Sequence, residues 1–170
     1  MSIGELTQQG SATPEAVRVF LVGLDSGNDE GKLIFLSKEQ DLPNPGNYKT
    51  TMEALINDLK TEFSQGQRTP ADFTFKRKTR ICFCIDIKNW EFEGDGFDFK
   101  SGVTNDSFFD LKRESGPGRF ETLSLLDDLV INPGQTKEYP FNLLIETATN
   151  IPNNSKPLSI VVDPAIKNEG

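Results

Sequence analysis

The sequence predicts a mainly β protein: an antiparallel β-sandwich, jelly-roll-like, with one amphipathic helix near residues 51–64. The first observation is a series of short apolar or alternating segments separated by turn signals at roughly 8–12-residue intervals, which is typical of sandwiches. The second is that a single segment shows helical periodicity. The third is that helical and strand segments do not alternate, which argues against a doubly wound parallel sheet.

The first predicted strand covers residues 16–24, a nearly continuous apolar run rich in β-branched residues. Such a run is expected of a central strand that is buried on both faces. A dense turn signal follows at residues 25–31, and residues 32–36 return as a second strand. The two runs therefore predict a hairpin with a long loop.

The helix is predicted from apolar residues at offsets of three, four, seven and eleven, which form one helical face: Met52, Leu55, Ile56, Leu59 and Phe63. Thr50 followed by Glu53 fits a capping box at its start, and Gly66 lies just past its end. A face of this size is suited to lie across a sheet.

From residue 72 onward the pattern is that of β-strands. The clearest period-two alternation places Ile81, Phe83 and Ile85 on one face and Cys82 and Cys84 on the other. Other short apolar or alternating runs predict further strands, at residues 73–75, 92–99, 108–111, 120–126, 129–131, 139–145 and 158–162. Thirteen of the sixteen aromatic residues are Phe, so we expect a core of Phe and aliphatic side chains.

The domain organisation follows from where the apolar pattern starts and stops. Residues 1–14 are polar and small and predict an N-terminal arm, residues 15–166 a single β-sandwich domain, and residues 167–170 a polar tail. We expect the arm, or both ends, to pack on the domain or on another copy of the chain.

Composition excludes several chemistries. The 170 residues include no His, which rules out a histidine base, a Ser–His pair and a histidine metal ligand. The net charge of −8 argues against nucleic acid as a partner. Cys82 and Cys84 indicate reduced thiols and a cytoplasmic location, and no apolar stretch is long enough to predict a membrane span.

The candidate partner-binding residues are basic. Lys76, Arg77, Lys78 and Arg80 form one run, and Arg113 and Arg119 flank a Gly-Pro-Gly turn. A basic stripe on an acidic protein can contact an acidic patch on a partner. Other interpretations of the run are lysine protection of an edge strand and binding of single-stranded nucleic acid. The two arginines could instead form surface ion pairs or clamp an anion.

Acidic loops are the weak candidates for a metal site. Asp25, Asn28, Asp29 and Glu30 offer oxygen ligands of the kind that Ca²⁺ prefers, but their spacing is not that of an EF-hand. We therefore predict no metal and no cofactor, and no catalytic residue is singled out, because no nucleophile motif is present.

The closing segment, residues 158–166, is an apolar strand that runs into Asp163-Pro164 and a further apolar pair. In this it resembles the end of small bacterial β-sandwich proteins of the DP-EP family and of the inclusion-body family that includes AidA and PixA. The Glu-Pro element of the former is absent, since Glu169 is followed by Gly170. The resemblance implies a bacterial sandwich without established catalysis and assigns no functional residue.

The functional hypothesis is a non-enzymatic protein of the bacterial cytoplasm that binds proteins, including copies of itself. The stripe at residues 76–80 would contact acidic loops such as residues 25–30. Two alternatives from other classes are a small-ligand-binding sandwich with a Phe-lined pocket under the helix, and an enzyme that uses carboxylates and a bound metal.

Overall fold

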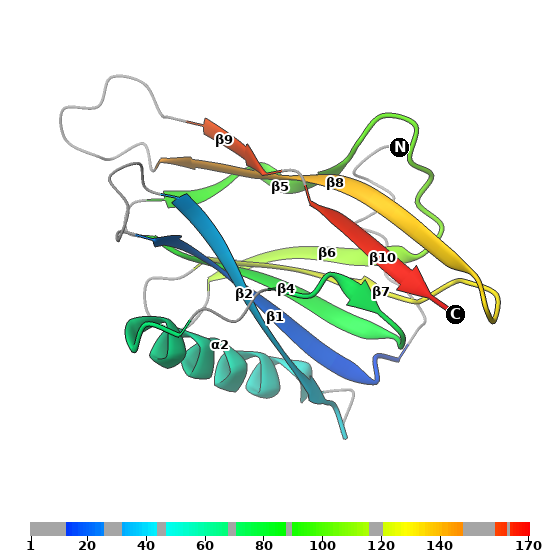
Figure 1. Cartoon of the computed structure of the whole chain (residues 1–170), viewed down its shortest axis with the longest axis horizontal. Helices are drawn as coiled ribbons and strands as arrows, with labels where there is room; N and C mark the ends of the chain where they lie inside the picture. Colours follow the sequence, from blue (N-terminus) through cyan, green and yellow to red (C-terminus); the bar gives the residue numbers. More distant parts are fainter. Residues whose placement is uncertain are drawn as a thin grey trace.

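The computed structural model describes residues 13–25, 32–43, 47–67, 71–87, 90–115, 121–147, 159–162 and 164–170. Among these residues, two β-sheets pack face to face, and one helix covers the outer face of one of them (Figure 1). The expected mainly β sandwich with one helix is thus confirmed. In the described part of the chain, no helix is both long and apolar enough to cross a membrane.

The first sheet has five strands, which are, in spatial order, β2 (Lys32–Asp41), β1 (Ala16–Asp25), β4 (Thr79–Asp86), β7 (Glu121–Asp127) and β6 (Phe108–Ser115). The expected hairpin joins β1 and β2, with Ala16 opposite Asp41. The strands β1 and β4, by contrast, run parallel, with Ala16 opposite Thr79. Parallel neighbours need a long connection between them, and helix α2 (Tyr48–Ser64) lies in the segment that joins β2 to β4. A two-residue hairpin turn can join only antiparallel strands.

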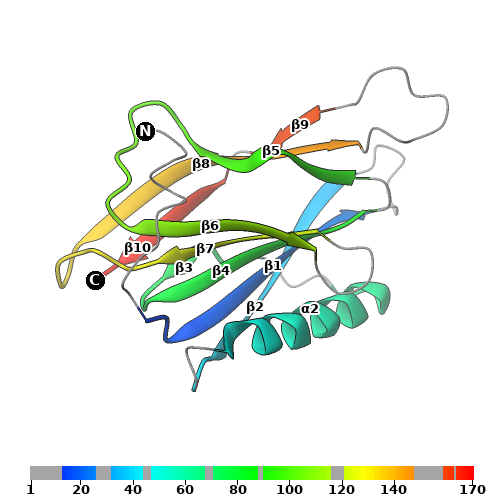
Figure 2. The same ribbon diagram turned by 180° about the vertical axis from the view of Figure 1, so that it is seen from behind.

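The second sheet contains, in order, β3 (Thr74–Phe75), β10 (Ala165–Glu169), β8 (Thr136–Thr147) and β5 (Trp90–Phe99), with β9 (Ser159–Val162) also paired to β8. β3 and β10 are parallel, so both sheets are mixed rather than purely antiparallel. The view from behind shows β10 and β8 stacked over the first sheet (Figure 2).

The space between the sheets is filled by aromatic and aliphatic side chains from both sheets, as the composition predicts. Rings of Phe83, Phe97 and Phe141 lie within 6.4 Å of one another between their centroids. Stacked and tilted ring pairs of this kind add to the free energy gained from area burial. The packing of these side chains fixes the position of one sheet against the other.

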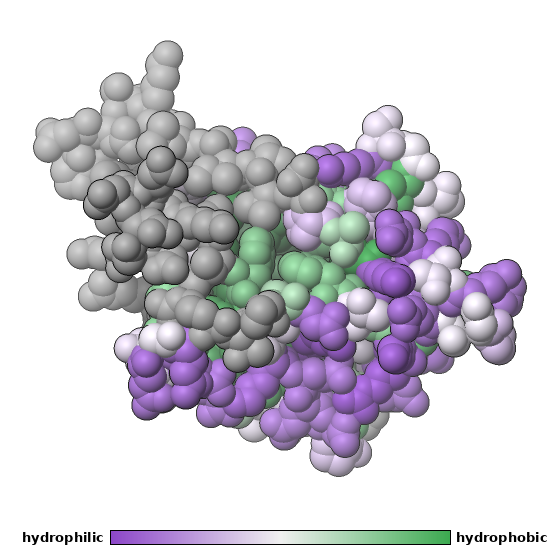
Figure 3. Space-filling model, in the orientation of Figure 1, coloured by the Kyte–Doolittle hydropathy of each residue, from purple (hydrophilic) through white to green (hydrophobic). Residues whose placement is uncertain are grey.

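Helix α2 (Tyr48–Ser64) forms the third layer. Its buried residues Met52, Leu55, Ile56 and Leu59 pack on the outward faces of β1, β2 and β4, where Cys82 and Cys84 lie. Its other side is hydrophilic (Figure 3). The helix starts earlier than the predicted residue 51, after Asn47, and no side chain caps its backbone; the Thr50 hydroxyl donates instead to Oδ1 of Asn47, at 3.0 Å.

Two further segments differ from the sequence expectation. Residues 129–131, expected as a strand, belong to the loop between β7 and β8. Residues 167–169, expected in a polar tail, belong to β10. In β10 the inward position after Ile166 is taken by Asn168, so the apolar alternation that marks a strand stops one step early.

Candidate functional site

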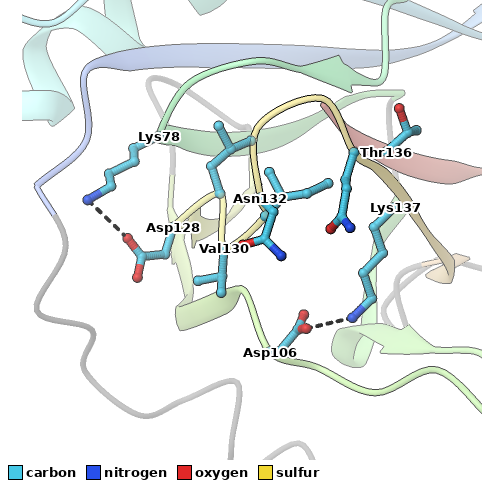
Figure 4. Close-up of a pocket in the computed structure, with 10 residues that line it drawn as sticks. Lys78, Asp106, Asp128, Val130, Asn132, Thr136 and Lys137 are labelled. Atoms are coloured by element: carbon cyan, nitrogen blue, oxygen red, sulfur yellow. Dashed lines mark hydrogen bonds and ion pairs between the residues drawn. The ribbon is translucent and has the colours of Figure 1, made fainter. Parts of the chain in front are cut away.

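A pocket of about 890 Å³ lies at one end of the sandwich, around the loop that joins β7 to β8. Its lining comes from three places: the turn before β4, the turn before β6, and the loop with the start of β8 (Figure 4). The lining residues are Lys78, Asp106, Asp128, Leu129, Val130, Ile131, Asn132, Gln135, Thr136 and Lys137. Polar groups and aliphatic side chains thus share the surface.

The first half of this loop is held by hydrogen bonds that its backbone amides donate. The Asp128 amide donates to the Ser107 carbonyl at 2.8 Å, and the Val130 amide donates to the Ser107 hydroxyl at 3.0 Å. The Leu129 amide donates to Oδ1 of Asp127 at 3.0 Å, and Leu129 has a φ of 51°. A non-glycine residue in the left-handed region costs about 1 kcal/mol or more and persists only where its surroundings enforce it.

The second half is held by the end of the described chain. The amide of Gly134 donates to the carbonyl of Gly170 at 3.3 Å, and the amide of Gly170 donates to the carbonyl of Gln135 at 2.8 Å. A Cβ built on Gly170 would come within 2.0 Å of the carbonyl oxygen of Asn132, so no larger residue fits there unless the loop moves. The loop is therefore fixed at both ends.

Two ion pairs lie on opposite sides of the pocket (Figure 4). Nζ of Lys78 lies 3.5 Å from Oδ1 of Asp128, and Nζ of Lys137 lies 2.5 Å from Oδ2 of Asp106. Asp106 also accepts a hydrogen bond from the Tyr139 hydroxyl at 2.7 Å. Burial disfavours the charged form of Asp106, but these bonds from Lys137 and Tyr139 outweigh it and lower the pKa of Asp106.

Val130 lies between the two ion pairs (Figure 4). Within the described residues it is the one large hydrophobic side chain that is exposed, with 47% of its surface accessible. Its neighbours Leu129 and Ile131 are partly buried. The pocket therefore has an exposed apolar centre and a charged, paired rim.

A buried polar cluster lies directly beneath the loop. Oδ1 of Asp127 accepts hydrogen bonds from the Ser107 hydroxyl at 2.8 Å, from Nδ2 of Asn168 at 2.9 Å and from the Leu129 amide. All three side chains are fully buried. Burial raises the pKa of Asp127 to about 6, although its hydrogen bonds oppose that shift. The fully buried Ser107 hydroxyl donates to Asp127 and accepts from the Val130 amide.

The basic run does not form one surface, because its side chains reach different parts of the chain. Lys76 pairs with Glu169 at 3.7 Å, Arg77 with Glu39 and Asp41 at 2.7 and 2.6 Å, and Lys78 with Asp128. Arg80 is 2% exposed and is bound to Asp110 and to Ser124. Of the run, Lys78 alone lines the pocket.

The other predicted residues lie elsewhere. Arg113 donates to the carbonyl oxygens of Phe92 and Gly94 at 2.6 and 2.5 Å. Arg119, Asn28, Asp29 and Glu30, and the side chain of Asp25, lie outside the described part of the chain. No group of three or more acidic or cysteine side chains that could hold a metal ion occurs among the described residues.

The cysteines and the Phe residues pack as parts of the interior. Neither thiol forms a disulfide, both thiols are buried, and burial raises the pKa of Cys84 to about 12. The space under the helix is filled by aliphatic side chains, Met52 and these two cysteines, with the partly buried Tyr48 and Phe63 packed against them, while the fully buried Phe side chains lie between the sheets.

Of the residues that line the pocket, sequence patterns singled out Lys78 alone, and they missed the buried Asp127 and Asn168 beneath it. Asp127 and Asn168 each take an inward strand position, in series with Leu125 and Ile166 respectively. A polar residue at an apolar position of a strand is the signal that could have identified them.

No protein-family model, no curated protein and no solved structure matches this chain.

Proposed function

We propose that this protein is a non-enzymatic binding protein that recognises a segment of another polypeptide in the pocket beside the β7–β8 loop. The observation that carries the proposal is that the exposed Val130 lies between two ion pairs. Protein interfaces share this anatomy, in which an apolar centre is desolvated on binding and a polar rim remains accessible to water.

The rigidity of the loop supports the proposal. Its backbone is hydrogen-bonded at both ends, and Leu129 is held in a strained conformation. A surface that is fixed before binding loses little conformational entropy when a partner docks, which favours affinity.

The polar groups of the rim define the chemistry of the partner. Lys78, Asp128, Asp106 and Lys137 carry charges that sum to zero, whereas the whole chain carries −8. Asn132, Gln135 and Thr136 are exposed and supply amide and hydroxyl groups. We infer a partner segment with one apolar side chain and a hydrogen-bonding backbone, rather than a highly charged ligand.

Self-association and location belong to the same proposal. A second copy of the chain is one partner that the pocket would accept, and the basic run contributes through Lys78. Two buried thiols that form no disulfide are what a reducing cytoplasm allows. Catalysis is not part of the proposal, because the Ser107 hydroxyl and the Cys84 thiol are both buried away from a substrate.

The test is to select binding peptides from a random displayed library with the wild-type chain, and then to measure them against Val130→Arg. We expect Val130→Arg to weaken binding by about 2 kcal/mol or more, roughly thirtyfold, because central interface residues carry the affinity. Thr61→Arg is the matched control, since it adds the same charge at an exposed β-branched residue of helix α2. Light scattering of the same variants tests self-association.

Equal binding to Val130→Arg and the wild type, or a library that yields no binding peptide, would contradict the proposal. Loss of binding in Thr61→Arg as well would show that added positive charge, rather than the pocket, is responsible.

A further inference from the structure

Two buried oxygen atoms beneath the pocket have no hydrogen-bond partner: Oδ2 of Asp127 and Oδ1 of Asn168. They belong to residues that already share one hydrogen bond, from Nδ2 of Asn168 to Oδ1 of Asp127 at 2.9 Å. Buried polar atoms are almost always paired, so two unpaired atoms on one bonded pair of side chains need an explanation.

The chemistry of the two groups supplies one. A carboxylic acid and a primary amide can form a ring of two hydrogen bonds, one from the amide N–H to the acid carbonyl and one from the acid O–H to the amide oxygen. The first of these bonds is present. Oδ1 of Asp127 accepts three hydrogen bonds, so the vacant Oδ2 is the atom that would carry a proton. One proton there would give both unpaired oxygens a partner.

We propose that protonated Asp127 and Asn168 form this two-bond ring, that the ring fixes the floor of the pocket, and that ionisation of Asp127 opens it. The consequence for partner binding rests on the function proposed above; the ring itself does not.

The position of the pair explains why it would act on the pocket. Asp127 ends β7 in the first sheet and Asn168 lies on β10 in the second, so their contact joins the two sheets. Asp127 also holds the Leu129 amide, and Gly170, two residues after Asn168, holds Gly134 and Gln135. The first half of the pocket loop is therefore attached to Asp127, and the second half is attached to the strand that carries Asn168.

The surroundings of Asp127 favour the neutral acid. The charged and titratable residues on the elements packed around it include Lys78, Arg80, Asp106, Asp110, Asp128, Lys137, Glu138, Tyr139, Lys167 and Glu169. Each of these four cations pairs with a different carboxylate, at Asp128, Asp110, Asp106 and Glu169. Asp128 disfavours a second negative charge next to it. Among the described residues, Asp127 therefore has hydrogen-bond donors but no ion pair.

The direction of the pH effect follows. The pKa of Asp127, about 6, lies above the ordinary value of an aspartate. The ring is closed below that pH and opens as pH rises through it. Ionisation would place a buried charge beside the unpaired oxygen of Asn168, which repels it.

The experiment follows the side-chain resonances of the full-length, isotope-labelled chain by NMR between about pH 4.5 and 8, a range that brackets the shifted pKa. We expect the carboxyl carbon of Asp127 and the side-chain amide of Asn168 to titrate with one midpoint. Amide protection of Leu129 and Val130, corrected for intrinsic exchange, should fall at least about tenfold above it. A midpoint in the ordinary aspartate range, or an Asn168 amide that does not follow, overturns the proposal.

Two variants sharpen the test. Asp127→Asn places an N–H where the acid has its O–H, so its ring should stay closed and its loop protection should not change with pH. Asp128→Asn, the same change one residue later, should keep the pH transition. An Asp127→Asn chain that retains the transition contradicts the proposal, and if that chain does not fold, the wild-type titration decides. None of these readouts uses a peptide, so failure of the ring and failure of the proposed function are separable.

Discussion

Arg80 is a charged residue of strand β4 that is buried beside the start of helix α2. Its guanidinium contacts Oδ2 of Asp110 at 2.9 Å and the Ser124 hydroxyl at 2.8 Å, and it lies 4.7 Å from the centre of the Tyr48 ring. Asp110 adopts a φ of 57° at a break in the pairing of β6 with β7, which brings its carboxylate to Arg80. The basic run thus contributes a structural contact where the sequence predicts a binding surface.

Replacement of Arg80 by Met should destabilise the fold by about 1.5–3 kcal/mol, because it removes the charge-assisted hydrogen bonds to Asp110 and Ser124 and leaves Asp110 with Lys112 as its cation. The matched change Lys76→Met, at a side chain that is 76% exposed, should change stability by about 0.5 kcal/mol or less. Urea unfolding of both variants measures the difference. Equal effects would show that Arg80 behaves as a surface residue.

Cys84 gives a second prediction at this scale. Because burial raises its pKa to about 12, almost none of the thiol is ionised near neutral pH, and the thiolate is the reactive form. We expect iodoacetamide to leave the native chain unlabelled and to label it rapidly in urea. Fast labelling of the native chain would contradict the packing of Cys84 under helix α2.

At the scale of elements, helix α2 shows what periodicity can predict. Its buried face was predicted from spacing, because a helix that packs on a sheet repeats its apolar residues every three to four positions. The capping box was not found, since the Thr50 hydroxyl bonds to Asn47 inside the first turn. A terminus depends on a few local bonds, whereas a face depends on the whole segment.

Truncation of Leu55 to Ala should lower the free energy of unfolding by about 2–5 kcal/mol, since the side chain is 1% exposed and leaves a cavity against the sheet. Glu53→Ala, on the exposed side of the same helix, should change it by about 0.5 kcal/mol or less. Thermal or urea unfolding measures both. A small loss for Leu55→Ala would mean that the helix packs loosely.

The loop between β7 and β8 shows where sequence patterns fail. Residues 129–131 are apolar in sequence and were expected to pair as a strand, but the positive φ of Leu129 turns the chain out of the sheet. That conformation is imposed by Asp127 and Ser107 through hydrogen bonds. Ser107 is distant in sequence, and no local propensity encodes such a contact. The shape of the pocket was therefore not predictable, although most of the strands around it were, and Lys78 is the one lining residue that the sequence singled out.

At the scale of the whole molecule, two carboxyl groups at the pocket make opposite contributions to stability. The folded pKa of Asp127 is raised, so its contribution is complete below the unfolded value of about 3.9 and is lost as pH rises through about 6. The folded pKa of Asp106 is lowered, so its contribution is present above the unfolded value and is lost as pH falls through the folded one.

The free energy of unfolding should therefore increase as pH is lowered from about 7.5 to 5. Asp127→Asn should remove the part of this increase that comes from protonation of Asp127. Asp106→Asn should leave this limb unchanged and flatten the loss at lower pH. Urea unfolding over a pH series measures both limbs. An unfolding free energy that rises steadily with pH in the wild type would contradict the assignment for Asp127.

The parallel pairing of β1 with β4 has a consequence for synthesis on the ribosome. Residue 16 can pair with β4 only after residue 79 has been synthesised. Pairing of β4 with β7 on its other side is complete only after residue 127 has been synthesised. Closing such distant contacts is slow, and an emerging apolar strand without its neighbours is prone to aggregate. Nascent chains arrested before β4 should thus depend on chaperones, whereas chains that extend beyond β10 should not.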